Sequence, residues 1–220
     1  MVVNRRARTA GALLLTLGSA LAGSYSSGAS CRAEGPDWPG AGSFWVTERL
    51  ATGSLGAGSS RVTTLLLGER LWRGRPAIAL QEGAEILYLD QGHRLLARTR
   101  DGRVVERYEP EDPILAWPLF LGRTWQAELA IVPAGDRSRG RHVVVDARVE
   151  AYEETRTQAG RFAAFRVARD GGAERVLLWW SPDLGIVIKE ERQRTAVHRL
   201  GAGTLRLQLV TYSMAPDPDP

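Results

Sequence analysis

Four tryptophans are the strongest candidates for a functional site in this sequence of 220 residues. Trp179 and Trp180 are adjacent in a segment with the pattern of a strand, so we expect their side chains on opposite faces of a sheet. Together with Trp117 and Trp125 they could line a cleft for an apolar ligand, because open barrels hold such ligands in their mouths. The alternative is that all four fill the core and the corners of the fold.

The other reactive side chains form no catalytic or metal-binding pattern. His93, His142 and His198 lie far apart, at no metal-ligand spacing, so we expect them to be solvated or singly hydrogen-bonded. No Gly-x-Ser-x-Gly elbow is present to carry a nucleophilic serine. We therefore predict no catalytic residue, no metal site and no cofactor, and a protein that is not an enzyme.

The positive charge of the chain does not indicate nucleic acid. The formal net charge is +4, and Arg5, Arg6 and Arg8 at the N-terminus supply most of it. The remaining arginines alternate with acidic residues, and no basic helix or RNA-binding aromatic pattern is present. We predict no binding of nucleic acid.

The N-terminus has the pattern of an export signal. A basic start is followed by an apolar stretch, residues 10–21, and by Ala20-Leu21-Ala22, which suits signal-peptide cleavage. The apolar stretch is too short to span a membrane. We predict a signal peptide at residues 1–22 and a mature protein in the periplasm or outer envelope.

Cys31 is the only cysteine, so an internal disulfide is impossible. The sequence Gly28-Ala29-Ser30-Cys31 resembles the lipobox of bacterial lipoproteins, in which the cysteine is acylated and becomes the first mature residue. The alternative is cleavage after Ala22, which leaves an unmodified thiol. Any membrane attachment is expected to go through this lipid anchor.

Alternating apolar and polar residues predict an all-β fold. The odd positions from 143 to 151 are apolar, as in a half-buried strand, and Asp101-Gly102 is a strong hairpin signal. We expect an antiparallel meander of about ten to twelve strands that forms a strongly curved sheet or open barrel, because one flat sheet rarely holds so many. The alternative is two packed β layers.

Composition sets the expected domain limits. Residues 23–42 are rich in Gly, Ser and Pro and are predicted to be a tether, residues 43–213 a single β domain, and residues 214–220 a disordered tail. Two prolines and three acids at residues 109–113 interrupt the pattern, so two β halves divided near 109–117 are possible. A solvated loop is expected there.

Three motifs resemble those of a group of uncharacterised bacterial envelope proteins, some of which are domains of unknown function. The resemblance implies an exported domain, similar in shape to the lipoprotein carriers LolA and LolB, and no known activity. The motif residues look structural, with glycines for turns, prolines at strand ends and aromatics in the core. The matches are Pro-Leu-x-x-Gly-x-x-Trp, Ala-Gly-x-Phe and Trp-x-x-Pro-x-Leu-Gly, which give as structural positions Pro118, Gly122, Gly160, Phe162, Pro182 and Gly185.

Three functions remain open at this point. The first is a non-enzymatic envelope protein that binds an apolar ligand or a partner protein on one face of the curved sheet. The second is an accessory that docks on an envelope complex through an exposed sheet edge or loop. The third and weakest is a hydrolase, for which we expect two or three buried acids in one cleft.

Overall fold

The computed structural model describes residues 31–135 and 140–216. Within them the chain forms strands and connecting turns, with no helix. The predicted signal peptide, residues 23–30 of the tether and the last four residues of the tail lie outside the described residues. The strands are β1 (Arg32–Ala33), β2 (Gly40–Gly53), β3 (Gly58–Trp72), β4 (Arg75–Glu82), β5 (Glu85–Leu89), β6 (Arg94–Arg100), β7 (Arg103–Pro113), β8 (Leu119–Phe120), β9 (Thr124–Pro133), β10 (Arg141–Thr157), β11 (Gly160–Asp170), β12 (Glu174–Ser181), β13 (Ile186–Arg194) and β14 (Gly203–Ala215).

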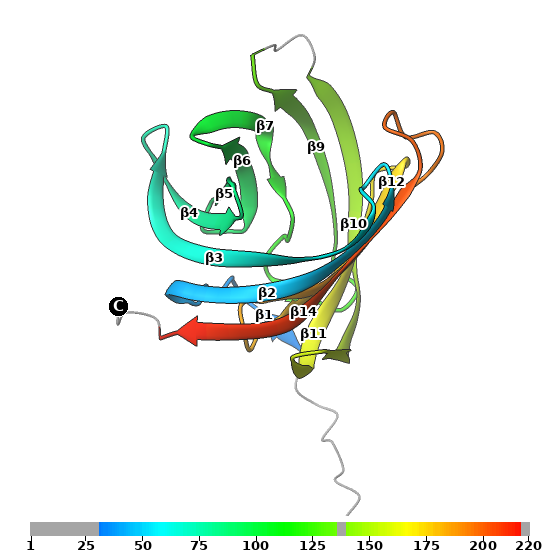
Figure 1. The fold of residues 1–220 in the computed structure, drawn as a ribbon. Coiled ribbons are helices and arrows are strands. Elements are labelled where there is room, and N and C mark those ends of the chain that lie inside the picture. The colour runs from blue at the N-terminus through cyan, green and yellow to red at the C-terminus, as the bar shows by residue number, and fades with distance from the viewer. Residues whose placement is uncertain (1–30, 136–139, 217–220) are drawn as a thin grey trace, which may run out of the picture.

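Twelve of these strands form one closed antiparallel barrel (Figure 1), in the order β10-β11-β12-β13-β14-β2-β3-β4-β5-β6-β7-β9. The pairing of β9 with β10 completes the ring, and β1 and β8 form a separate two-stranded sheet. The long strands β2, β3 and β14 lie side by side. The prediction of an all-β, strongly curved antiparallel sheet is confirmed, and the sheet closes on itself instead of splitting into two layers.

Local sequence patterns explain the regular parts of the barrel. In β10 the odd positions are the less exposed ones, and Ala147 and Val149 are fully buried. A bulge between Val149 and Ala151 then shifts the register against β11. Asp101 and Gly102 both have positive φ angles, 51° and 73°, as the tight hairpin between β6 and β7 requires.

The proline-rich segment at 109–113 differs from the prediction. It is neither a solvated loop nor a boundary, because β7 continues through it to Pro113. Arg94 and Leu95 of β6 pair with Pro113 and Asp112. β7 also pairs with β9, so the sheet runs without interruption across the predicted division.

The predicted tether and tail are also shorter than expected. Residues 31–42 are ordered, because β1 pairs with β8, Trp38 packs on the core and β2 begins at Gly40. At the other end β14 extends to Ala215, which pairs with Gly40. The buried hydroxyl of Ser43 ties these ends together, since it donates to the Gly40 carbonyl and accepts from the Ala215 N–H.

Two apolar clusters form the core. The first draws its large members from β2 to β6 and from β11 to β14, and includes Trp45 and Trp179. The second centres on Trp180 and Phe165 and receives Leu115 and Leu119 from the segment between β7 and β9. This segment, residues 114–120, therefore fills part of the barrel that the strands alone would leave open.

Candidate functional site

A cavity of about 170 Å³ lies inside the barrel. Its wall is built by β2, β3, β4, β5, β13 and β14, which are neighbours in the barrel, and by Trp180 of β12. Side chains that face one cavity from seven neighbouring strands stand on the concave inner face of the sheet. The lining is largely apolar, and its aromatic and aliphatic members include Trp38, Trp45, Leu80, Leu87, Leu89, Ile114, Leu115, Ile186, Ile188 and Leu207.

A strap of residues 34–39 and the β5–β6 turn cover one end of this cavity. The ring of Trp38 meets the edge of His93 with centroids 3.8 Å apart, and its Nε1 donates to the Gln91 carbonyl at 3.4 Å. Trp117 Nε1 donates to the Gly92 carbonyl at 3.1 Å. The turn itself is held by Asp90, whose Oδ1 accepts the N–H groups of Gly92 and Arg94.

His93 is almost completely buried beneath the strap, so of the two predicted states, solvated or singly hydrogen-bonded, the solvated one is wrong for this residue. Only 5% of the residue is exposed, and its φ angle is +63°. Burial lowers the pKa of its imidazole to about 3, so the ring is neutral. Its Nε2 has no hydrogen-bond partner among the described residues.

Arg123 holds the other side of the cover in place. Its Nε donates to the Ala116 carbonyl at 2.8 Å, and its Nη2 to the Trp117 carbonyl at 2.9 Å. Because both acceptors belong to the segment that carries Ile114 and Leu115, this guanidinium fixes two residues of the cavity wall. No sequence pattern marks Arg123, since it is one arginine among 28.

The cavity wall also carries carboxyl groups, which the sequence analysis did not single out. Glu82 of β4 and Glu190 of β13 both line it. Glu82 is opposite Glu85 in the β4–β5 pair, and Thr64 Oγ1 donates to its Oε1 at 3.3 Å. Burial raises the pKa of Glu82. The bond from Thr64 and the charge of Arg98 oppose this effect, while Glu190 and Glu85 add to it.

Arginines neutralise the other acids of this region. Both Arg98 and Arg100 of β6 bind the carboxylate of Glu85. Burial alone would raise the pKa of Glu85, but these two bonds outweigh it and lower the pKa. Arg192 binds Glu190 at 2.8 Å. Glu82 has no ion pair within 4 Å among the described residues, so it is the cavity's one carboxyl without a counter-ion in that part of the chain.

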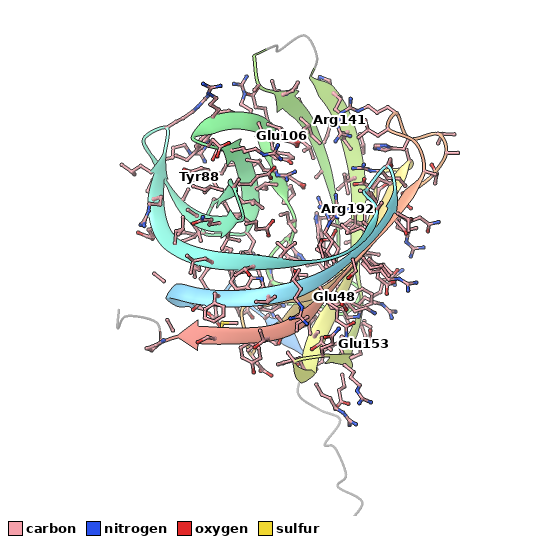
Figure 2. All side chains as sticks on the ribbon, in the orientation of Figure 1. Glu48, Tyr88, Glu106, Arg141, Glu153 and Arg192 are labelled. Carbon is pink, nitrogen blue, oxygen red and sulfur yellow. The ribbon has the colours of Figure 1, made fainter. Side chains whose placement is uncertain are left out.

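The charged network continues away from the cavity. Arg192 also contacts Glu174 at 3.5 Å, and Arg194 binds the same carboxylate at 2.5 Å. Tyr108 donates to Glu106 at 2.8 Å, and burial together with that carboxylate raises the pKa of the phenol. Glu106 and Arg192 are labelled in Figure 2. The barrel interior thus has apolar parts and a part lined with paired charges.

The predicted tryptophans occupy different places. Trp180 is 1% exposed and lines the cavity, and Trp117 packs on it edge to face at 4.9 Å. Trp125 packs against the same cluster and donates from Nε1 to the Pro113 carbonyl at 3.2 Å. The structure thus brings Trp180, Trp117 and Trp125 together, with Trp180 alone of the predicted four in the cavity wall.

Trp179 belongs to the other core cluster. A bulge separates it from Trp180 in the pairing with β13. Its Nε1 donates to Glu153 at 2.9 Å, and the ammonium of Lys189 lies 4.1 Å from the ring centroid. The indoles of Trp38 and Trp45 also line the cavity, although neither residue was among the candidates. Trp38 lies in the segment that was predicted to be a tether.

The motif residues occupy turns and core positions. Pro118 follows a cis peptide bond and precedes β8. The Gly122 N–H donates to the Val149 carbonyl at 3.0 Å, and Gly160 begins β11 with a φ angle of 143°. Phe162 is 9% exposed.

Pro182 and Gly185 lie in the turn between β12 and β13. A Cβ atom on Gly185 would lie 1.8 Å from the Asp37 carbonyl oxygen, so the strap can cross this turn only at a glycine.

A second, more open groove of about 620 Å³ crosses β9, β10 and β11 and is lined largely by polar residues. Its acids are already bound: Gln126 donates to Asp146 at 2.7 Å, and the Gly172 N–H donates to Asp170 at 2.7 Å. Both Arg166 and Arg175 contact Glu150. Of the four predicted tryptophans Trp125 lines this groove, but the acids around it are already occupied by partners within the described residues.

Other predicted features can be placed as well. Asp112 forms an ion pair with Arg169 in which both side chains are nearly buried, contrary to the expected solvated loop. His198 is buried and its Nδ1 accepts from the Leu200 N–H at 3.2 Å. Among the described residues no three ligating side chains gather as a metal site would require, and no helix there is long and apolar enough to cross a membrane.

Comparisons with known proteins give a likeness of shape only. No protein-family model matches the sequence, and no curated protein matches it. A proposed lipoprotein from Parabacteroides distasonis aligns over 82% of this chain and 99% of its own, with 11% identity and a TM-score of 0.35. The predicted resemblance to LolA and LolB stays a prediction.

Two further solved structures are similar to the same degree. A proposed exported protein with a YmcC-like fold from Bacteroides fragilis covers 80% of this chain and 98% of its own, at 10% identity and a TM-score of 0.37. The hypothetical lipoprotein YmcC from Escherichia coli covers 80% of this chain and 85% of its own, at 11% identity and a TM-score of 0.34. Likeness at this level carries no functional conclusion.

Proposed function

We propose that this protein is an exported, non-enzymatic β-barrel that binds a small, largely apolar molecule in the cavity beneath the strap. The observation that carries the proposal is the cavity itself: about 170 Å³, bounded by residues of seven strands and lined by Trp38, Trp45 and Trp180. Cores of this kind are normally filled, and an apolar cavity of about 150 Å³ takes up benzene in an engineered protein.

The size of the cavity limits what it holds. One ring or a short chain suits about 170 Å³. Pockets for drug-sized ligands start near ~300 Å³, and a diacyl lipid needs still more. The carriage of lipids that a shape similar to LolA and LolB implied is therefore not part of this proposal.

Calorimetric titration with benzyl alcohol tests the proposal. We expect saturable binding to the purified chain, and a loss of at least about tenfold in affinity for Leu207→Phe, which fills the cavity. Leu71→Phe, at a side chain that is 71% exposed, is the matched control. If Leu207→Phe fails to fold, Leu87→Phe fills the same space. Absent binding, or equal binding by the filled and control variants, would contradict the proposal.

A hydrolase is the second candidate, because Glu82 and Glu190 line one cavity as that hypothesis required. Acid catalysis on a glycoside uses two carboxyl groups free to reach the substrate. Glu190 is instead bound to Arg192 through one of its oxygens, at 2.8 Å from Nη2 and 2.9 Å from Nε. The arrangement therefore supports ligand binding better than hydrolysis.

The location of the protein rests on the predicted signal peptide and on Cys31, which is exposed and adjoins β1. Because β1 pairs with β8, acylation of Cys31 would hold the barrel at the bilayer surface with almost no tether. A native mass spectrum of protein from its own envelope fraction distinguishes a chain that starts at acylated Cys31 from one that starts at Gly23. A chain that retains residues 1–22 in the cytoplasmic fraction would contradict export.

A further inference from the structure

The chemistry of the ligand follows from the one carboxyl group in the cavity wall that lacks a counter-ion. Glu82 and Glu85 are cross-strand partners, so both point to the inner face. Arg98 and Arg100 of β6 both bind Glu85, and Arg192 binds Glu190. Within the described residues this leaves Glu82 with the hydroxyl of Thr64 at 3.3 Å as its hydrogen-bond donor.

The negative charge of an ionised Glu82 is poorly compensated by the side chains around it. A charge removed from water is costly unless it is paired. An ammonium group placed against Glu82 would supply the missing counter-ion, while the indoles and aliphatic side chains contact the rest of the molecule.

Resting on the proposed function, we infer that the cavity binds a small amphiphilic amine, with its ammonium group against Glu82 and its apolar part against Trp45 and Trp180. The other charges around the cavity leave this place open to a cation. The ammonium of Lys189, whose residue lines the wall, lies over the ring of Trp179 and 3.0 Å from Glu191. His93 at the covered end is neutral and adds no positive charge.

Binding of an amine is coupled to the protonation of Glu82. In the empty cavity, burial and the neighbouring carboxyl groups of Glu190 and Glu85 favour the protonated form, while Arg98 and the hydroxyl of Thr64 favour the ionised form. An ammonium ligand pairs with the ionised form, so the proton of Glu82 goes to solvent when the amine binds. Affinity for the amine should therefore fall as the pH is lowered through the raised pKa of Glu82.

Three probes of nearly equal size separate the possibilities: benzylamine, benzyl alcohol and phenylacetate, each titrated calorimetrically into the full chain at about pH 8 and about pH 5. We expect benzylamine to bind at least about tenfold more tightly than benzyl alcohol at the higher pH, and phenylacetate to bind least. Glu82→Gln should remove the advantage of the amine, so that benzylamine and benzyl alcohol bind the variant with similar affinity. Glu128→Gln, at an exposed glutamate of β9, is the matched control.

Each outcome has a separate meaning. If the alcohol binds as tightly as the amine, or if Glu82→Gln leaves the preference intact, the amine inference is wrong while the proposed cavity function stands. If none of the three probes binds, the proposed function itself fails. If Glu82→Gln does not fold, Glu82→Met or a comparison of the two pH values in the unmodified chain replaces it.

Discussion

The inner face of β4 carries one carboxyl group, Glu82, whose surroundings differ from those of its neighbour Glu85. The two are cross-strand partners, yet Arg98 and Arg100 of β6 both bind Glu85. The pKa of Glu85 is lowered in consequence, and the pKa of Glu82 is raised by burial. Two glutamates directly opposite each other in the sheet therefore have opposite effects on the pH dependence of stability.

Replacing Glu82 with Gln should stabilise the ligand-free protein at high pH. The folded-state pKa of Glu82 lies above the ordinary value of 4.5, so its contribution to stability is present below that pH and is lost as the pH rises through the raised pKa. Gln keeps the acceptor for Thr64 without a charge. Urea denaturation should show Glu82→Gln more stable at about pH 8 and equal to the unmodified chain at about pH 4. A variant that is less stable at both values would contradict this.

At the residue scale, sequence reasoning identified bulky aromatics but not their partners. Trp180 was identifiable because a tryptophan in a strand pattern must be buried or functional. Glu82 was not, since a glutamate at the end of a strand looks like any solvated acid. Its role depends on Arg98 and on Glu190, which come from other strands, and no local pattern encodes such pairings.

Among the connecting elements, the strap of residues 34–39 contributes Trp38 to the cavity wall. Its sequence resembles a linker, yet Trp38 contacts the His93 ring and the strap crosses the β12–β13 turn at Gly185. The apolar anchor is one residue in a segment of Gly, Pro and acids. This explains why composition predicted a tether where the structure has a cover.

Changing Gly185 to Ala should displace the strap. The new Cβ would lie 1.8 Å from the Asp37 carbonyl oxygen, and the φ angle of 68° adds strain of about 1 kcal/mol. We expect a loss of about 2–4 kcal/mol in the free energy of unfolding, with faster hydrogen exchange in residues 34–39.

Gly172→Ala is the control, because its φ angle is 75° and nothing lies within 4 Å of its Cβ. It should lose about 1 kcal/mol, from backbone strain alone. Equal losses for the two variants, with unchanged exchange in the strap, would show that the contact with Asp37 does not hold the strap in place.

Most strands were predictable from the sequence, but whether a proline-rich segment ends a strand was not. Alternation located β10 and β14, and Asp101-Gly102 located a hairpin, because these signals are local. The prolines at 110 and 113 suggested a break, but β7 tolerates both. Pro110 lies in the stretch 108–111 that has no partner in β6, and Pro113 is the last residue of the strand. Whether a proline ends a strand depends on neighbours that the local sequence does not specify.

The whole barrel should unfold as one unit. Every barrel strand is paired on both sides, and β7 links the two halves that the sequence suggested. We expect urea denaturation curves from tryptophan fluorescence and from far-UV circular dichroism to coincide. Two separate transitions, one for residues before 109 and one for residues after 117, would show independent halves.

The seam between β2 and β14 has a consequence for the timing of folding. Thr52 and Thr204, which share a hydrogen bond across it, are 152 positions apart. When the chain leaves a ribosome or a translocation channel, the backbone N–H and C=O groups along one edge of β2 therefore have no strand partner until β14 follows. Because long loops delay such closure, we expect the unpaired edge of β2 to stay available for aggregation until β14 pairs with it.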